Sequence, residues 1–214
     1  MPYRALLWDN DGVLVDTESL YFAATRAVMA HIGVDLTEEL YFELFLVRSS
    51  GAWHLAAERG LGEAEIAALR RERNAIYIGL LEKEPLVIGG VREALRELRP
   101  HFLMGIVTSS RRDHFEAIHR RTGFREYFDF ALTIEDYARS KPAPDPYLAA
   151  IARAGVPAAE CLAIEDAPRG LAAARAAGLD CWVVPTAFSR RADFSTATRV
   201  LGGVHEVAAG LLGR

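Results

Sequence analysis

This sequence has few of the features that place a protein outside the cell or in a membrane. It contains only two cysteines in 214 residues, Cys161 and Cys181. Each begins an apolar run, which is typical of small core residues rather than of a disulfide or metal pair. No apolar run approaches the length of a membrane span, and the N-terminus lacks the apolar region of a signal peptide. We therefore expect a cytoplasmic protein without a membrane partner.

A strong charge of one sign is also absent. The formal net charge is -4, so there is no overall basic field, and we expect no nucleic-acid partner. A small phosphorylated ligand is not excluded, because a local site can be positive in an acidic protein. Hydrophobic residues make up 51% and charged residues 25% of the chain, which is ordinary for a globular protein. The length suffices for one sizeable core, or for a core with a small lid.

The pattern of apolar runs predicts an α/β fold with an inserted helical subdomain. Short apolar strands alternate with helices, which indicates a Rossmann-like, doubly wound parallel sheet covered on both faces. The chain from 17 to 83, in contrast, shows only helical patterns. We predict a core from residues 1–15 and 85–214, and an all-helical cap from residues 16–84. The predicted strands cover residues 3–8, 102–107, 128–132, 161–164, 181–184 and a short segment near 200–201.

An acidic stretch, DNDGVLVD from Asp9 to Asp16, follows the first predicted strand. Alternate residues of an extended segment point the same way, so Asp9 and Asp11 can face one pocket, and Gly12 lets the chain turn sharply. Two like charges about 4 Å apart repel by roughly 4 kcal/mol at an effective dielectric near 20. A divalent cation or a shared proton would remove this cost. The alternative is a surface turn, for which Asp-Asn-Asp-Gly is well suited. Asp16 is interpreted as structural.

Further polar residues follow other predicted strands. Thr108, Ser109 and Ser110 follow the second strand, Lys141 lies in the loop after the third, and Glu165-Asp166 ends the fourth. Ligands of such sheets bind beyond the carboxyl ends of the strands, so these residues should converge on one edge. Taken singly, each has a structural explanation: a solvated lysine, a helix N-cap threonine, or acids at a helix N-terminus. Their joint occurrence favours a site.

Four segments together resemble the motifs of the haloacid dehalogenase superfamily. They are DNDGVLVD, the IVT that ends at Thr108, SKPAPDPY around Lys141, and IEDAPRG from Ile164 to Gly170. The resemblance covers the whole core in order. The helical insertion is similar to the small cap of the β-phosphoglucomutase and phosphoglycolate phosphatase branch. An acid at the Asp11 position separates this pattern from the dehalogenases and favours phosphoryl transfer.

The resemblance and the physics of phosphoryl transfer imply the same roles. Asp9 would be the nucleophile that takes the phosphoryl group, and Asp11 would be the general acid and base. Mg²⁺ would be held by Asp9, the Asp11 carbonyl and Asp166, with Glu165 as a direct ligand or behind one. The predicted phosphate-binding residues are Thr108, Ser109 and Lys141.

The cap should select the substrate, and its candidate residues are Tyr21, Arg48, Ser49 and Trp53. The sugar phosphomutases that this chain resembles carry a phosphate-binding arginine in the corresponding cap loop, which suggests the same for Arg48. Those mutases have a histidine where Tyr21 stands and usually a glycine where Val47 stands. Both departures favour a plain phosphatase, although Arg48 could be an ordinary surface arginine and Trp53 could belong to the cap core.

We therefore predict a Mg²⁺-dependent phosphatase that hydrolyses small phosphate monoesters, with sugar or polyol phosphates as the expected substrates, through an aspartyl phosphate on Asp9. The first alternative is a β-phosphoglucomutase-type sugar-phosphate mutase. The second is a non-catalytic binding protein on the same fold. The expected partner is a small phosphorylated metabolite, and the expected assembly is a monomer or weak dimer.

Overall fold

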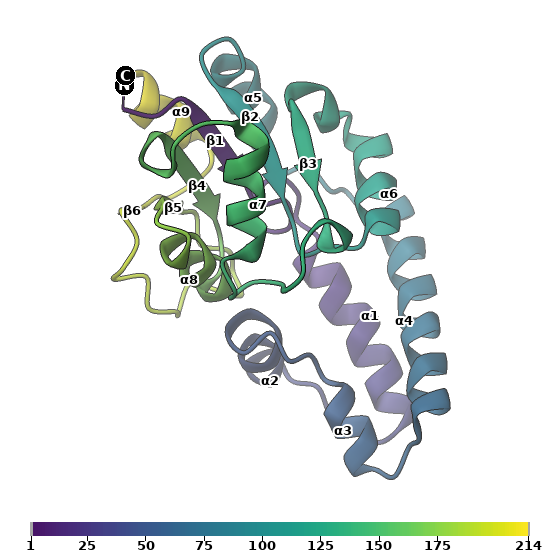
Figure 1. The fold of residues 1–214 in the computed structure, drawn as a ribbon. Helices are drawn as coiled ribbons and strands as arrows, with labels where there is room; N and C mark the ends of the chain where they lie inside the picture. Colours follow the sequence, from purple (N-terminus) through teal and green to yellow (C-terminus); the bar gives the residue numbers. More distant parts are fainter. Residues whose placement is uncertain (1, 214) are drawn as a thin grey trace.

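The computed structural model describes residues 2–213 and has a six-stranded parallel sheet at its centre (Figure 1). The strand order is β3-β2-β1-β4-β5-β6, which confirms the predicted doubly wound core. The direction of winding reverses between β1 and β4, and ligands of such sheets bind at this point. The strands are β1 (Ala5–Trp8), β2 (Leu103–Val107), β3 (Phe130–Leu132), β4 (Cys161–Glu165), β5 (Asp180–Val183) and β6 (Arg199–Val200).

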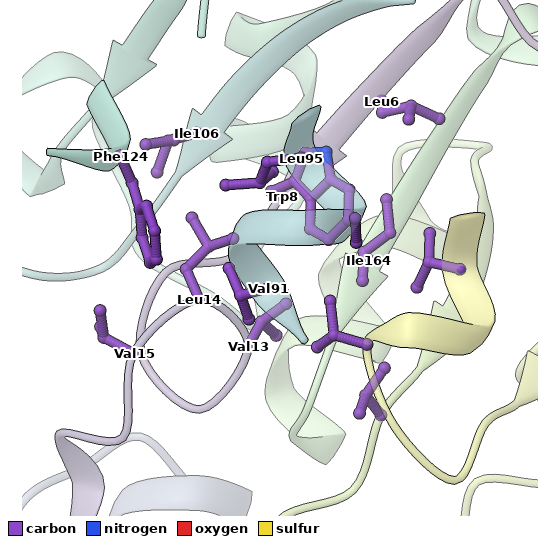
Figure 2. Close-up of a cluster of buried hydrophobic side chains, with 14 of the residues drawn as sticks. Leu6, Trp8, Val13, Leu14, Val15, Val91, Leu95, Ile106, Phe124 and Ile164 are labelled. Carbon is purple, nitrogen blue, oxygen red and sulfur yellow. The ribbon is translucent and has the colours of Figure 1, made fainter. Parts of the chain in front are cut away.

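Helices cover both faces of the sheet. On one face lie α5 (Val91–Leu98), α6 (Arg112–Thr122) and α9 (His205–Leu212); on the other lie α7 (Asp145–Ala154) and α8 (Pro168–Ala176). The residues of β1 alternate between these two layers, and all four are fully buried. A strand buried on both faces needs a continuous apolar sequence, which explains the run ALLW. Figure 2 shows Trp8 of β1 packed among side chains that include Leu95 of α5 and Ile164 of β4.

The register of the central strands aligns their carboxyl ends. Trp8 pairs with Ile106 of β2 on one side and with Ile164 of β4 on the other. The next residue, Asp9, donates its backbone N–H to the Ile164 carbonyl at 2.9 Å. Because the three strands end at the same level, the acidic stretch after β1 lies beside the polar residues that follow β2 and β4.

A helical insertion lies between β1 and β2 in the chain. It contains α1 (Glu18–His31), α2 (Glu38–Tyr41), a π-helical segment (Phe42–Val47), α3 (Trp53–Glu58) and α4 (Glu63–Lys83). Figure 1 shows α1 and α4 packed side by side beyond the carboxyl edge of the sheet. The insertion has its own apolar cluster, which includes Phe22 and Tyr41. Phe188, from the loop after β5, packs against both rings, with centroids 5.7 and 5.8 Å away.

The helices between residues 2 and 213 include none with both the length and the apolar character of a membrane span.

Two glycines provide a test of how tightly the sheet is packed. A Cβ added to Gly105 in β2 would lie 2.3 Å from the Phe130 ring, whereas one added to Gly79 in α4 would meet no atom within 4 Å. We expect Gly105→Ala to lower the free energy of unfolding by about 1–3 kcal/mol through overpacking. Gly79→Ala should raise it by about 0.5–1 kcal/mol, because alanine favours the helix. Urea unfolding of both variants measures this; equal effects would contradict the packing described here.

Candidate active site

Lys141 stands at the centre of a buried cluster of charges under the carboxyl edge of the sheet. Its side chain is 2% exposed, and its ammonium donates to Asp9 Oδ1 at 2.9 Å, Glu165 Oε1 at 2.6 Å and the Val107 carbonyl at 2.8 Å. Tyr147 of α7 donates a further hydrogen bond to Glu165 Oε1. Residues at the ends of three strands, in a loop and in α7 thus form one hydrogen-bond network. It fixes the Asp9 carboxylate through one oxygen only, since the Lys141 bond is to Oδ1.

Burial and neighbouring charges shift the pKa values in this cluster. Burial raises the pKa of Asp9 to about 7; Lys141 opposes this shift, and the Glu165 and Asp11 carboxylates add to it. Burial alone would lower the pKa of Lys141, but Asp9 and Glu165 outweigh it and hold that pKa above its ordinary value. Lys141 therefore stays charged, while the carboxyl groups around it would, if all were ionised, carry more negative charge than one ammonium can balance.

A third carboxylate completes the acidic cluster. Asp9, Glu165 and Asp166 each offer an oxygen, and these three atoms lie within 4.8 Å of one another. Asp166 is 3% exposed, and its Oδ2 has no hydrogen-bond partner among residues 2–213. Burial, followed by the neighbouring carboxylates, raises its pKa well above the ordinary value. An unpartnered buried oxygen beside two other carboxylates is the donor set that a hard divalent cation prefers. The cluster therefore fits a metal ion.

Gly12 allows this close arrangement. Its φ of +85° lies in the left-handed region, and a Cβ at this position would come within 2.3 Å of Asp166 Oδ2. Any other residue would be strained and would also displace the carboxylate. The turn after Asp11 therefore needs glycine for both reasons.

Asp11 is half-buried and is held by three hydroxyl groups. Thr17 donates to its Oδ1 at 2.5 Å, while Ser110 and Thr108 donate to its Oδ2 at 2.7 and 3.1 Å. Thr17 directly precedes α1, so one of these hydroxyls comes from the start of the helical insertion. The contact from Ser110 is absent from the predicted set, which includes Ser109 instead. The Ser109 hydroxyl is buried without a hydrogen-bond partner.

Asn10 anchors the loop between the two acids. Its side chain is fully buried, and its Oδ1 lies 2.9 Å from Nε2 of His119 in α6. Its backbone carbonyl accepts hydrogen bonds from the N–H groups of Leu14 and Val15, at 2.9 and 3.1 Å. Burial lowers the pKa of His119 to about 4, so the imidazole is neutral near neutral pH. This inward anchor turns the side chains on either side of Asn10 toward the edge of the sheet.

A cavity of about 800 Å³ lies between this edge and the helical insertion. Most of the predicted residues line it, and Glu165 and Asp166 lie buried beneath it. Arg48 is not brought to it: this side chain is 65% exposed and pairs with Glu43 at 2.6 Å. The predicted residues that line the cavity are Asp9, Asp11, Tyr21, Ser49, Trp53, Thr108, Ser109 and Lys141.

The structure adds cavity residues that sequence reasoning did not single out. Arg169 at the start of α8 reaches across to the insertion, where its Nη1 lies 3.5 Å from the Ser49 hydroxyl. Glu18 of α1 is buried and accepts a hydrogen bond from the Tyr41 hydroxyl. Arg169 falls within the quoted motif IEDAPRG and could have been identified there. Glu18 carries no comparable signal, because acids are common in the first turn of any helix.

The fold and the acidic site are those of the haloacid dehalogenase-like hydrolases, and comparison with known proteins agrees. The model of that family matches residues 3–178, which is most of the chain. This protein therefore belongs to the haloacid dehalogenase-like hydrolase family.

Three similar proteins illustrate this membership, and the name of one of them gives a sugar-phosphate substrate. Protein CbbY of Rhodobacter capsulatus is 32% identical, and the match covers 92% of each chain. Fructose-1-phosphate phosphatase YqaB of Escherichia coli is 34% identical over 83% of this chain and 94% of its own. A crystal structure of a CbbY mutant from Rhodobacter sphaeroides, in complex with xylulose-(1,5)bisphosphate, superimposes with a TM-score of 0.81. It is 29% identical, and the match covers 95% of this chain and 96% of its own.

The acidic cluster should destabilise the protein when no cation is bound. The raised pKa of Asp166 means that the folded state binds its proton more tightly than the unfolded state does. Stability in a chelator should therefore fall as the pH rises above about 4, the ordinary aspartate pKa. We expect Asp166→Asn to raise the free energy of unfolding by about 1–3 kcal/mol at about pH 8 in a chelator, because it removes an unpartnered buried charge.

Urea unfolding with and without Mg²⁺ tests this expectation. Mg²⁺ should stabilise the unaltered protein and should have little effect on Asp166→Asn. Asp35→Asn, at an exposed position of the insertion, serves as the control and should respond to Mg²⁺ like the unaltered protein. An Asp166→Asn variant that is less stable than the parent in a chelator would contradict this account of the cluster.

Proposed function

We propose that this protein is a Mg²⁺-dependent phosphatase that hydrolyses small phosphate monoesters, sugar or polyol phosphates among them, through an aspartyl phosphate on Asp9. The observation that carries the proposal is the Lys141 cluster. One ammonium joins Asp9 to Glu165 beside the unpartnered Asp166, at the floor of a cavity large enough for a small metabolite. The name of one relative, a fructose-1-phosphate phosphatase, supports the choice of sugar phosphates.

In the first half-reaction, a carboxylate oxygen of Asp9 attacks the phosphorus and the bond from phosphorus to the ester oxygen breaks. Lys141 bonds Oδ1 of Asp9, which leaves Oδ2 for the attack. Asp11 gives a proton to the departing oxygen, so the alcohol leaves as a neutral molecule. Lys141, together with Thr108 and the backbone at Ser109, offsets charge on the phosphoryl oxygens. A Mg²⁺ ion held by Asp9, the Asp11 carbonyl and Asp166 would supply further positive charge to the same oxygens.

In the second half-reaction, water attacks the phosphorus of the aspartyl phosphate. Asp11 takes a proton from that water, and the bond between phosphorus and the Asp9 oxygen breaks to give phosphate and free Asp9. The hydroxyls of Thr17, Ser110 and Thr108 keep the Asp11 carboxylate at the mouth of the site between the two steps. Glu165 holds Lys141 in place and does not bind the metal ion directly in this proposal, because its Oε1 already accepts hydrogen bonds from Lys141 and Tyr147.

We also propose that the protein acts in the cytoplasm on a small phosphorylated metabolite, as a monomer or weak dimer. The net charge of -4 supports the exclusion of nucleic acid as a partner. The mutase alternative depended on Arg48 as a cap residue that binds phosphate, and its pairing with Glu43 outside the cavity removes that support. A mutase would interconvert isomers of a sugar phosphate without net release of phosphate. Phosphate release from either isomer, with no interconversion, is the outcome expected here.

The roles of the two acids are separable with p-nitrophenyl phosphate, whose leaving group needs little help from an acid. Asp9→Asn should lower turnover in Mg²⁺ by at least about a thousandfold, because no nucleophile remains. Asp11→Asn should still release one equivalent of nitrophenol per enzyme but then stall, because no base activates water for the second step. Stopped-flow absorbance measures both.

Asp35→Asn is the matched control and should turn over normally. A sustained turnover by Asp9→Asn, or a phosphorylated residue other than Asp9 in Asp11→Asn, would contradict the proposal. If the unaltered protein releases no phosphate from a broad panel of phosphate esters, the reading as a non-catalytic binding protein gains instead.

A further inference from the structure

The wall of the cavity opposite the acidic cluster is formed by α4, and it is rich in arginine. Residues spaced three or four apart on a helix share one face, and such a set from α4 faces the cavity. The α4 residues that line the cavity are Ala67, Arg70, Arg71, Arg73, Asn74 and Tyr77. Three guanidinium groups therefore belong to one side of the cavity, whereas the carboxylates that line it come from the sheet edge, α1 and the loop after β3.

These three arginines lack the carboxylate partners that surface arginines usually have. In the part of the chain that the structure describes, no carboxylate oxygen lies within 4.0 Å of Arg70, Arg71 or Arg73, although eight other arginine and lysine side chains make such contacts. Arg70 and Arg71 are exposed, and Arg70 lies over the Trp53 ring at 5.3 Å. The positive charge of this wall is consequently not balanced by the protein itself.

Arg73 is the least expected member of the group, because it is buried. It is 6% exposed, and its guanidinium lies 4.3 Å from the centre of the Tyr21 ring and 5.5 Å from the centre of the Trp53 ring. Its Nε donates to Asn74 Oδ1 at 2.9 Å, but its Nη1 has no hydrogen-bond partner in the described part of the chain. A buried charged donor without an acceptor is costly. Two rings and a neighbouring amide hold this guanidinium, and an anionic ligand in the cavity would supply the missing acceptor.

We infer that α4 binds a second phosphate group of the substrate, with Arg73 and Arg70 as its principal ligands, so that the preferred substrate is a bisphosphorylated sugar or polyol. This inference rests on the proposed function, in which the first phosphate lies between Asp9 and Lys141. Tyr77 lies at the end of α4 nearer the sheet, where its ring contacts His114. Arg70 is two turns further along, at about 10 Å by the rise of the helix. A substrate with a phosphate at each end of its carbon chain would span this separation.

A phosphate suits this wall better than a carboxylate or neutral hydroxyl groups do. A phosphate monoester carries close to two negative charges and three acceptor oxygens, and a planar guanidinium can bond two of them at once. Several arginines around one dianion would balance the charge of the wall, whereas a single carboxylate would leave most of it uncompensated. Hydroxyl groups would leave all of it in place.

The test compares initial rates of phosphate release from four substrates in Mg²⁺: a fructose bisphosphate, the corresponding fructose monophosphates, gluconate phosphate and p-nitrophenyl phosphate. For the unaltered protein, we expect kcat/KM for the bisphosphate to exceed that for the monophosphates by at least about tenfold. In Arg73→Met and Arg70→Met, the ratio of kcat/KM for the bisphosphate to kcat/KM for p-nitrophenyl phosphate should fall by about tenfold or more. Arg73→Lys keeps the charge but not the planar guanidinium, so its ratio should lie between those of the unaltered protein and Arg73→Met.

Two variants control for loss of cap charge. Arg26 is exposed on α1 and lies over the Phe22 ring, outside the cavity, so Arg26→Met should leave the ratio unchanged. Arg48→Met should also leave it unchanged, because Arg48 pairs with Glu43. Thermal unfolding of each variant verifies that it is folded, and exposed Arg70 keeps the test valid if the buried Arg73 proves necessary for folding.

The results distinguish failure of this inference from failure of the proposed function. The second phosphate site would be overturned, with the phosphatase left intact, by any of three results. These are equal kcat/KM values for the bisphosphate and the monophosphates, a preference for gluconate phosphate, or a bisphosphate to p-nitrophenyl phosphate ratio that responds to Arg48→Met but not to Arg70→Met. Absence of p-nitrophenyl phosphate hydrolysis by the unaltered protein would instead remove the proposed function on which the site rests.

Discussion

The buried ammonium of Lys141 is the interaction on which the rest of this structure depends. It bonds Asp9, Glu165 and a carbonyl of β2 in a region that water hardly reaches. Removing one partner of such a buried group costs several kcal/mol, about 3–5 in measured cases. The ammonium is nevertheless outnumbered by carboxylates, so the cluster stays short of positive charge. That deficit, together with the unpartnered oxygen of Asp166, makes the site receptive to a cation.

Much of the core could be predicted because local sequence decides it. Strands such as β1 and β4 are buried on both faces and therefore read as short continuous apolar runs. The rule that ligands bind beyond the carboxyl ends of parallel strands then brings Asp9, Lys141 and Asp166 to one edge, although they are far apart in the chain. The remaining differences are small: the third strand begins at Phe130 rather than at residue 128.

The helical insertion was predictable as helices but not as a binding surface. Which side of a helix faces a cavity depends on how it packs against the others, and apolar and charged residues are mixed around the circumference of α4. Phosphate binding was expected of Arg48 because similar phosphomutases carry an arginine in the corresponding cap loop, but in the structure Arg48 pairs with the nearby Glu43. Arg73 gave no signal in a run of charged residues, since its burial depends on two rings from α1 and α3. The contact of Phe188 with the insertion is likewise a product of tertiary packing.

The central claim is that acids from both ends of the chain hold one magnesium ion beside Asp9, and a crystal structure grown with Mg²⁺ and inorganic phosphate tests it most directly. The account predicts a single ion about 2.0–2.1 Å from carboxylate oxygens of Asp9 and Asp166, with the phosphate bonded to Lys141 and facing Asp9. An ion bound elsewhere, or a phosphate that occupies the cavity without contact to Lys141, would contradict it.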